Sequence, residues 1–164
     1  MRRRLLAAVL LIALGSASCT TVGPAYTPHP SVQSDQSLLY IYRPQARALS
    51  VLTAVFAMDE VPVAKLENSG YVAVLTKPGA HKLRHNWKAG LMGNSELETQ
   101  TIEATVTLAP GSTTYMRLSS VASSQYQSGT VHTNWQWELR QTAESVAVEE
   151  LKQCRRGELI ATPR

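Results

Sequence analysis

VHTNWQWELR, residues 131–140, shows the clearest alternation of side-chain character in this chain. Its odd-numbered residues are mostly apolar, and its even-numbered residues are polar. Successive side chains of a β-strand point to opposite faces of the sheet, so a period of two with both tryptophans on one face predicts a half-buried antiparallel strand. The inward face of this strand would carry Val131, Thr133, Trp135, Trp137 and Leu139.

Similar short segments follow one another from Ser37 onward, and TIEATVTL at 101–108 alternates in the same way. They are rich in Val, Leu, Thr, Tyr and Trp and are separated by Gly, Pro, Asn or Asp. Such regularly spaced segments are typical of an all-β sandwich or barrel. The expected strands are 37–43, 51–58, 61–66, 70–76, 80–88, 99–108, 112–121 and 130–140.

Turn-forming residues separate these segments. Pro-Gly pairs at 78–79 and 110–111 come just before a segment. There Pro supplies a fixed φ, and Gly supplies the positive φ of a type II turn. Asp59-Glu60 and Asn68-Ser69-Gly70 join two further pairs of segments. Residues 89–98, AGLMGNSELE, are polar and contain glycine, so we expect them to form the longest mobile loop.

The apolar period changes near the end of the chain. Apolar residues there lie three or four positions apart, namely Ala143, Val146, Ala147, Leu151 and Cys154. Glu144 would lie in the first turn of a helix, Lys152, Arg155 and Arg156 in its last turn, and Gly157 would stop it. The sequence therefore predicts a mainly β fold: an antiparallel β-sandwich with one C-terminal α-helix over residues 37–157, followed by a tail at 158–164.

Residues 1–18 have the three parts of a secretory signal peptide. Basic residues at 2–4 precede an apolar run at 5–14, and small residues at 15–18 precede Cys19. A membrane-spanning helix needs about 20 apolar residues, so this run is too short to cross a bilayer. We expect residues 1–18 to be an export leader.

The segment around Cys19 resembles the signal of bacterial lipoproteins, in which cleavage occurs before a cysteine that then carries lipid. Ala17 and Ser18 suit the positions before the cut, and Ser16 stands where such signals usually have Leu. The following CTTVGPAY is similar to the mature start of Gram-negative outer-membrane lipoproteins, so the resemblance implies that Cys19 is lipidated. Thr20, in place of Asp, implies an outer-membrane address facing the periplasm. Ordinary cleavage, a disulfide between Cys19 and Cys154, and an uncleaved leader stay open as alternatives.

Residues 19–36 would then form the lipidated N-terminus and a flexible tether. TTVGPAYTPHPSVQSDQ carries three prolines and no hydrophobic periodicity, which is typical of an extended linker. Such a segment spans at most ~55 Å and about 23 Å as a relaxed coil, so the folded part would stand clear of the lipid headgroups. If Cys19 carries lipid, Cys154 is left unpaired, and we interpret it as a small buried hydrophobe.

Charge argues against one class of partner. The formal net charge is +4, and removing the three arginines of the leader lowers it to +1. The mature chain thus lacks the clustered positive charge of a nucleic-acid-binding protein, and no nucleic-acid partner is expected.

Four segments together resemble a family of small bacterial lipoproteins, the domain of unknown function family DUF2846. They are LLYIYRP, VFAMDEVPVAKLENSGYVAVLTKPGAHKL, PGSTTYMRL and AVEELKQC, and the likeness covers roughly residues 37–155. The resemblance implies the sandwich and the lipid anchor. No catalytic residues come with it.

The sequence contains few motifs that are typical of catalytic or metal-binding sites. No Gly-x-Ser-x-Gly elbow and no phosphate-binding glycine loop occur in the sequence. His81 and His85 would share one strand face about 13 Å apart, which is too far to share a metal ion unless a neighbouring strand adds a ligand such as His132. We therefore expect neither an enzyme nor a bound metal or cofactor.

Aromatic residues could line a ligand groove, but a period of two favours core positions for Trp135 and Trp137. Tyr126, in the expected loop SSQYQSG, is the candidate ligand-binding residue. Two functional hypotheses follow. One is a lipid-tethered, non-enzymatic interaction or structural module of the cell envelope, and the other is a periplasmic protein that binds a small ligand or glycan. A concave aromatic pocket would favour the second, and an unpaired strand edge or a flat apolar patch would favour a protein partner.

Overall fold

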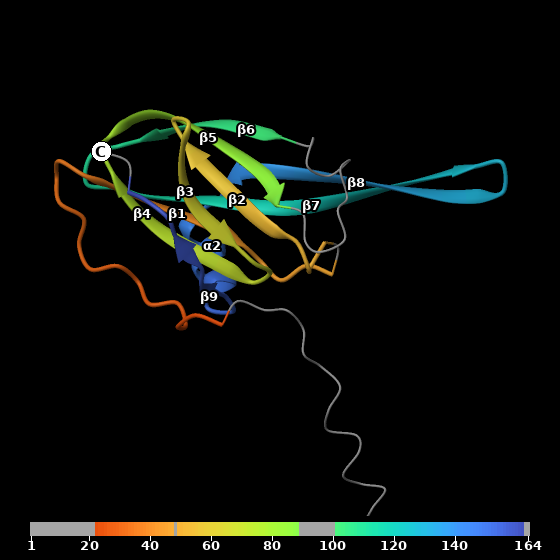
Figure 1. Ribbon diagram of the computed structural model, residues 1–164, viewed down its shortest axis with the longest axis horizontal. Helices are drawn as coiled ribbons and strands as arrows, with labels where there is room; N and C mark the ends of the chain where they lie inside the picture. Colours follow the sequence, from red (N-terminus) through yellow and green to blue (C-terminus); the bar gives the residue numbers. More distant parts are fainter. Residues whose placement is uncertain (1–21, 48, 89–100, 163–164) are drawn as a thin grey trace, which may run out of the picture.

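The computed structural model describes residues 22–47, 49–88 and 101–162. Within these ranges the chain forms two five-stranded sheets and one helix (Figure 1). Sheet A has the strand order β8-β7-β1-β4-β9, and sheet B has the order β10-β3-β2-β5-β6. The elements are β1 (Ser37–Arg43), β2 (Thr53–Met58), β3 (Val61–Leu66), β4 (Gly70–Thr76), β5 (Gly79–Lys88), β6 (Ile102–Leu108), β7 (Thr113–Gln127), β8 (Thr130–Gln141), α2 (Glu144–Leu151), β9 (Arg155–Arg156) and β10 (Glu158–Leu159).

The predicted fold class, a mainly β sandwich with one helix near the C-terminus, is confirmed. Most neighbouring strands are antiparallel, while β1 pairs with β7 and β4 pairs with β9 in parallel. The loop expected at 89–98, the leader and Cys19 lie outside the described residues.

The main core lies between the two sheets. Buried and less buried residues alternate along β2, so that Ala54, Phe56 and Met58 point inward. The same alternation in β5 turns His85 and Trp87 inward. These side chains pack against the inner face of sheet A, as the period of two predicts.

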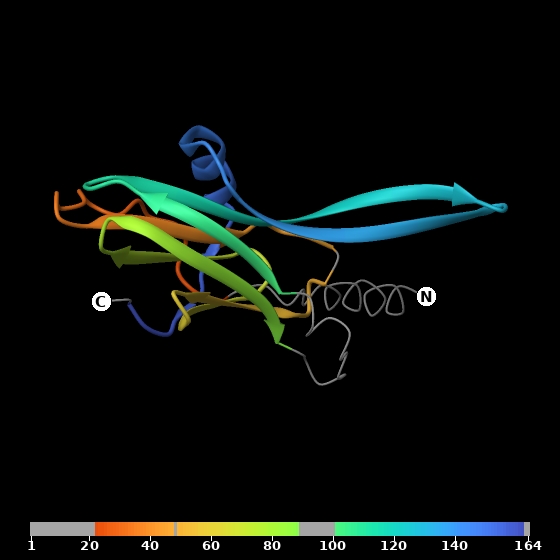
Figure 2. The ribbon, with the colours of Figure 1, turned by 90° about the horizontal axis from the view of Figure 1, so that it is seen from above.

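Strand β1 is buried on both faces. Leu39 and Ile41 face the main core, and the alternating residues Leu38, Tyr40 and Tyr42 belong to a second core on the outer face of sheet A. Figure 2 shows α2 on this outer side of sheet A. Because other residues pack on both faces of β1, its sequence is a nearly continuous apolar run and does not alternate between apolar and polar residues.

The turns form where the sequence places them. Asp59 and Glu60 both have positive φ, 48° and 68°, as a two-residue hairpin turn between β2 and β3 requires. Gly111 has a φ of 67°, and the N–H of Ser112 donates to the carbonyl of Ala109 at 3.2 Å, so a turn with positive φ at its third residue leads into β7.

The helix is shorter than predicted. It ends at Leu151, and the expected last turn is wrong because Arg155 and Arg156 form β9 instead. The N–H of Arg155 donates to the carbonyl of Ser69, and the N–H of Gly157 donates to that of Tyr71. Gly157 therefore does not cap the helix. A Cβ there would lie 2.6 Å from a methyl carbon of Leu66, so glycine allows close packing of the chain after β9.

The two ends of the described chain also differ from expectation. Residues 22–36, expected within the flexible tether, pack on the outer face of sheet A, where Tyr26 makes edge contacts with the rings of Tyr40 and Tyr71. Glu158 and Leu159, expected in the tail, form β10 and pair with β3. Both segments find partners that are distant in sequence, so neither local composition nor periodicity indicates them.

Candidate functional site

A long hairpin projects from the sandwich. Strand β7 pairs with β1 only as far as Arg117 and then continues with β8 alone, in a regular register from Val121 opposite Gln136 to Gln127 opposite Thr130. Figures 1 and 2 show this ribbon extending well beyond the rest of the molecule. We call residues 121–136 the arm.

Tyr126 lies in the arm. The sequence placed it in a loop, and this is wrong, because β7 runs on to Gln127 and the reversal involves only Ser128 and Gly129, which have positive φ. The Tyr126 side chain is 76% exposed. It is therefore available to a partner, but no described cavity contains it.

The arm continues the core-facing side of sheet A beyond the described strands of sheet B. Tyr126 pairs with Val131, and Leu118 pairs with Leu139. The sequence separations between Leu118 and Tyr126 and between Val131 and Leu139 are both even, so all four side chains lie on one face. Leu118 and Leu139 are buried, whereas Val131 is 61% exposed. The predicted inward face is thus confirmed for Leu139, and the expectation for Val131 is wrong because the strand extends beyond the described strands of sheet B. Trp137 is partly buried against the core, and the side chain of Trp135 lies outside the described residues.

The arm carries no carboxylate, ammonium or guanidinium side chain. Residues 119–137 contain no Asp, Glu, Lys or Arg. Beyond Arg117 the outer edge of β7 has no strand partner among the described residues, and β8 is the terminal strand of sheet A. Edge strands usually carry charges or prolines that block pairing with other chains. The outer edges of the arm therefore pair with no described strand, and the arm lacks the charged side chains that would oppose strand addition.

Arg43 is enclosed in the main core and holds the following loop in place. Its guanidinium donates to the carbonyls of Leu49 and Leu52 at 2.7 and 2.6 Å and lies 4.9 Å from the centre of the Trp87 ring. Burial lowers the pKa of Arg43 to about 10. Because its side chain is fully buried, Arg43 acts as a structural anchor for the backbone at Leu49 and Leu52.

His85 lies beside Arg43. Its ring centre is 5.2 Å from that of Phe56 and 4.6 Å from that of Trp87, and neither ring nitrogen has a hydrogen-bond partner in the described part of the chain. Burial, together with the positive charge of Arg43, lowers the pKa of His85 to about 3. The imidazole is thus a neutral core group.

His81 is held differently. One of its ring nitrogens lies 2.6 Å from a carboxylate oxygen of Asp59, and the other lies 2.9 Å from the carbonyl of Lys77. Burial alone would lower the pKa of His81, but these two hydrogen bonds and the charge of Asp59 raise it. No group of three or more potential metal-binding side chains occurs among the described residues, and the side chain of His132 is outside them.

The tyrosines of the outer face form a packed cluster. The rings of Tyr40 and Tyr115 stack at 5.3 Å, and the hydroxyl of Tyr40 accepts a hydrogen bond from the N–H of His29. A cavity of about 290 Å³ lies beside the cluster, between residues 24–30 and β4. Tyr40 and Tyr71 line it but are almost fully buried, at 2% and 4% exposed, so their rings support residues 22–36 and do not form an open aromatic groove.

Helix α2 is fixed to the same face by polar contacts. The guanidinium of Arg117 donates to both carboxylate oxygens of Glu150, and the hydroxyl of Tyr42 donates to the same carboxylate at 2.8 Å. Cys154 is 1% exposed, and burial with the nearby charge of Glu150 raises the pKa of its thiol to about 12. These values suit the interpretation of Cys154 as a small buried hydrophobe and do not suit a reactive thiol.

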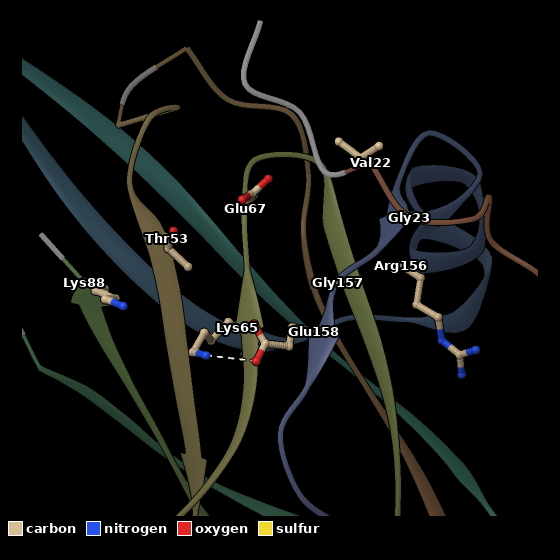
Figure 3. A pocket seen from close by; sticks show the side chains of 9 residues that line it. All are labelled: Val22, Gly23, Thr53, Lys65, Glu67, Lys88, Arg156, Gly157 and Glu158. Carbon is tan, nitrogen blue, oxygen red and sulfur yellow. Dashed lines mark hydrogen bonds and ion pairs between the residues drawn. The ribbon is translucent and has the colours of Figure 1, made fainter. Parts of the chain in front are cut away.

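A hollow of about 420 Å³ lies where the chain passes from β9 to β10 (Figure 3). It is open on one side to Val22, the first described residue, which is 96% exposed. Its lining residues come from both sheets and from the N-terminal segment, and they are Val22, Gly23, Thr53, Lys65, Glu67, Lys88, Arg156, Gly157 and Glu158.

Comparison of the chain with family models, with curated proteins and with solved structures found no match. The resemblance to the DUF2846 family therefore stays a prediction. Within the described residues no helix is both long enough and apolar enough to cross a membrane.

Sequence reasoning missed the arm and the interior role of Arg43. A signal for the arm was present, because two strand-like segments flank Ser128-Gly129 and the stretch around them lacks charge. The role of Arg43 carried no such signal, because its carbonyl partners and its tryptophan neighbour meet it only in the folded chain.

Proposed function

We propose that this chain is a membrane-anchored, non-enzymatic interaction module of the cell envelope, held by lipid on Cys19 in the outer membrane and facing the periplasm. The observation that carries the proposal is the arm, which contains no Asp, Glu, Lys or Arg and whose outer edges pair with no described strand. A two-stranded ribbon is only marginally stable by itself, and further strands on its edges stabilise it. The partner we propose is a β-strand of another envelope protein that adds to the arm.

Two features support this partner over a small ligand or a glycan. The aromatic side chains beside the described cavities are buried and already packed on one another. In contrast, Tyr126 and Val131 face solvent side by side on an arm that no other described strand covers. Strand addition uses backbone hydrogen bonds for affinity and such exposed side chains for specificity.

The arm is tested by crosslinking in intact cells. A photo-activatable residue replacing Val121 should form a discrete covalent adduct with a partner, because Val121 lies in the arm and is 48% exposed. Val131→Lys in the same chain should reduce the adduct about tenfold, since a charge on an edge strand opposes pairing. Adduct yield on a denaturing gel is the measurement.

Val146→Lys is the matched control, because Val146 is an exposed valine on α2, away from the arm. It should leave the adduct unchanged. Equal adduct yields from the Val131→Lys and wild-type chains would contradict a role for the arm.

The anchor is tested by Cys19→Ser. The wild-type chain should sediment with membranes, and the variant should appear in the soluble periplasmic fraction, because each buried CH₂ of an acyl chain contributes about 0.8 kcal/mol to membrane binding. The melting temperature of the domain should not change, because both cores are formed by residues from Tyr26 onward. The mass of the mature N-terminus provides the independent measurement.

The disulfide alternative makes the opposite prediction. The wild-type protein would be soluble at its unlipidated mass, and Cys19→Ser would release the thiol of Cys154. Wild-type protein in the soluble fraction without added lipid mass would rule out the anchor.

A further inference from the structure

We infer that the hollow beside Val22 lies against the membrane surface and that Lys88 and Arg156 bind the phosphates of anionic lipid headgroups there. This inference rests on the proposed lipidation of Cys19. It concerns the orientation of the domain on the membrane, which the lipid alone does not determine.

The N-terminal segment is fixed to the body directly after Val22. The N–H of Arg156 donates to the carbonyl of Pro24 at 2.9 Å, and Ala25 forms a β-bridge with Arg155. The Tyr26 ring is packed between two other tyrosines. Gly23 allows this close approach, because a Cβ at Gly23 would lie within van der Waals overlap of the carbonyl oxygen of Arg156.

The length of chain before Val22 then limits the distance to the membrane. Cys19 precedes Val22 by three residues. Even a fully extended chain covers no more than about 3.6 Å per residue, so the lipid-bearing residue lies within ~11 Å of Val22 in any conformation. The headgroup layer of a bilayer is about 5–7 Å thick on each side. The face of the domain around Val22 must therefore lie at or near the lipid surface, and not at the distance that a loose tether would allow.

The charges on this face suit anionic headgroups. Figure 3 shows Lys88 and Arg156 on opposite sides of the hollow, with the pair formed by Lys65 and Glu158 between them. The Lys65 ammonium and the Glu158 carboxylate are 2.9 Å apart and balance each other. Lys88 and Arg156 have no carboxylate partner among the described residues, and only one further acidic side chain, Glu67, lines the hollow. The two positive charges of Lys88 and Arg156 therefore outnumber the single remaining negative charge, that of Glu67.

The orientation of the domain is tested with the full lipidated chain in vesicles. A fluorophore on Thr53→Cys reports on the hollow, and one on Tyr126→Cys reports on the arm. The labels go to single sites, because Cys154 is buried and Cys19 carries lipid. Quenching is measured with lipids that carry a quencher on the headgroup, in vesicles of phosphatidylcholine alone and in vesicles with added phosphatidylglycerol.

We expect the Thr53 label to be quenched more strongly than the Tyr126 label, and the excess to increase with phosphatidylglycerol. Lys88→Gln and Arg156→Gln should each reduce the population of the bound orientation about fivefold in the anionic vesicles, which corresponds to ~1 kcal/mol per basic residue. Lys77→Gln and Lys82→Gln remove the same charge near the opposite end of β5, and Lys82 is about 20 Å from Lys88 along the strand. They should have no effect.

Failure of the anchor and failure of the orientation give different results. A mature N-terminus without acyl mass would overturn both the anchor and this inference. Acylated protein in which the two labels are quenched equally would overturn only the orientation. Stronger quenching at Thr53 that is the same in both vesicle types, or that survives Lys88→Gln and Arg156→Gln, would overturn the binding of anionic headgroups.

Discussion

Acidification is expected to destabilise the domain through His85, by about 2 kcal/mol at pH 5 and by about 5 kcal/mol once the pH falls below 3. Burial beside Arg43 lowers the pKa of this histidine from 6.5 to about 3 in the folded chain. Between these two values the unfolded chain binds a proton that the folded chain does not, so the free energy of unfolding decreases as the pH falls. Well above pH 6.5 the imidazole is neutral in both the folded and the unfolded chain, so His85 then causes no loss of stability.

The measurement is chemical unfolding of wild type and His85→Leu at several pH values between 8 and 4. At pH 8 the two proteins should have similar stability, because leucine has nearly the volume of histidine and the ring nitrogens of His85 have no partner in the described residues. The difference should then grow in favour of His85→Leu as the pH falls. Parallel curves for the two proteins would show that His85 titrates normally and is not enclosed.

His81 provides the matched control. The Asp59 carboxylate and the Lys77 carbonyl hold its pKa above the usual value. Its contribution is therefore present at low pH and is lost as the pH rises through the folded pKa. His81→Asn should lose stability relative to wild type mainly at acidic pH, which is the reverse of the trend for His85→Leu.

Trp87→Ala is expected to lower the free energy of unfolding by about 3–5 kcal/mol. The ring is 3% exposed and lies between the two sheets, 4.6 Å from the His85 ring and 4.7 Å from the Trp137 ring. Its removal leaves a large cavity and takes away the aromatic face over the Arg43 guanidinium. The urea midpoint should therefore decrease strongly, and the slope of the transition should change little.

Tyr126→Ala is the control for this substitution, since it removes an aromatic ring that is 76% exposed on the arm. Its effect on the free energy of unfolding should stay within about 0.5 kcal/mol. If Trp87→Ala were as mild as Tyr126→Ala, the core between the sheets would not be packed as described.

Local pattern was sufficient for most of the sandwich. Strand β1, strand β3 and strand β4 have the predicted bounds, because a period of two or a continuous apolar run identifies a strand without knowledge of its neighbours. The turn at Asp59-Glu60 and the turn at Gly111 were also predictable, since these backbones adopt a positive φ that particular turn types demand. The burial of Cys154 follows from the same apolar period that predicts the helix.

The sequence did not predict features that depend on contacts between residues far apart in the chain. The apolar period at 143–157 predicts a helix that continues to Arg156. However, Arg155 and Gly157 form backbone hydrogen bonds with Ser69 and Tyr71, so the chain leaves the helix after Leu151. Likewise, the alternation of 131–140 describes the strand correctly but does not reveal that the described strands of sheet B leave Val131 exposed.

The sequence by itself determined the strands, their turns and the inward side of most of them, because those features depend on backbone sterics and on a side-chain period of two. Only the tertiary structure decided that residues 22–36 are held against sheet A and that the arm projects beyond the other described strands. Composition marked residues 22–36 as a loose linker. However, the ring contacts of Tyr26 and the hydrogen bond to Pro24 offset the entropy of ordering this segment, and these contacts exist only once β4 and β9 have formed.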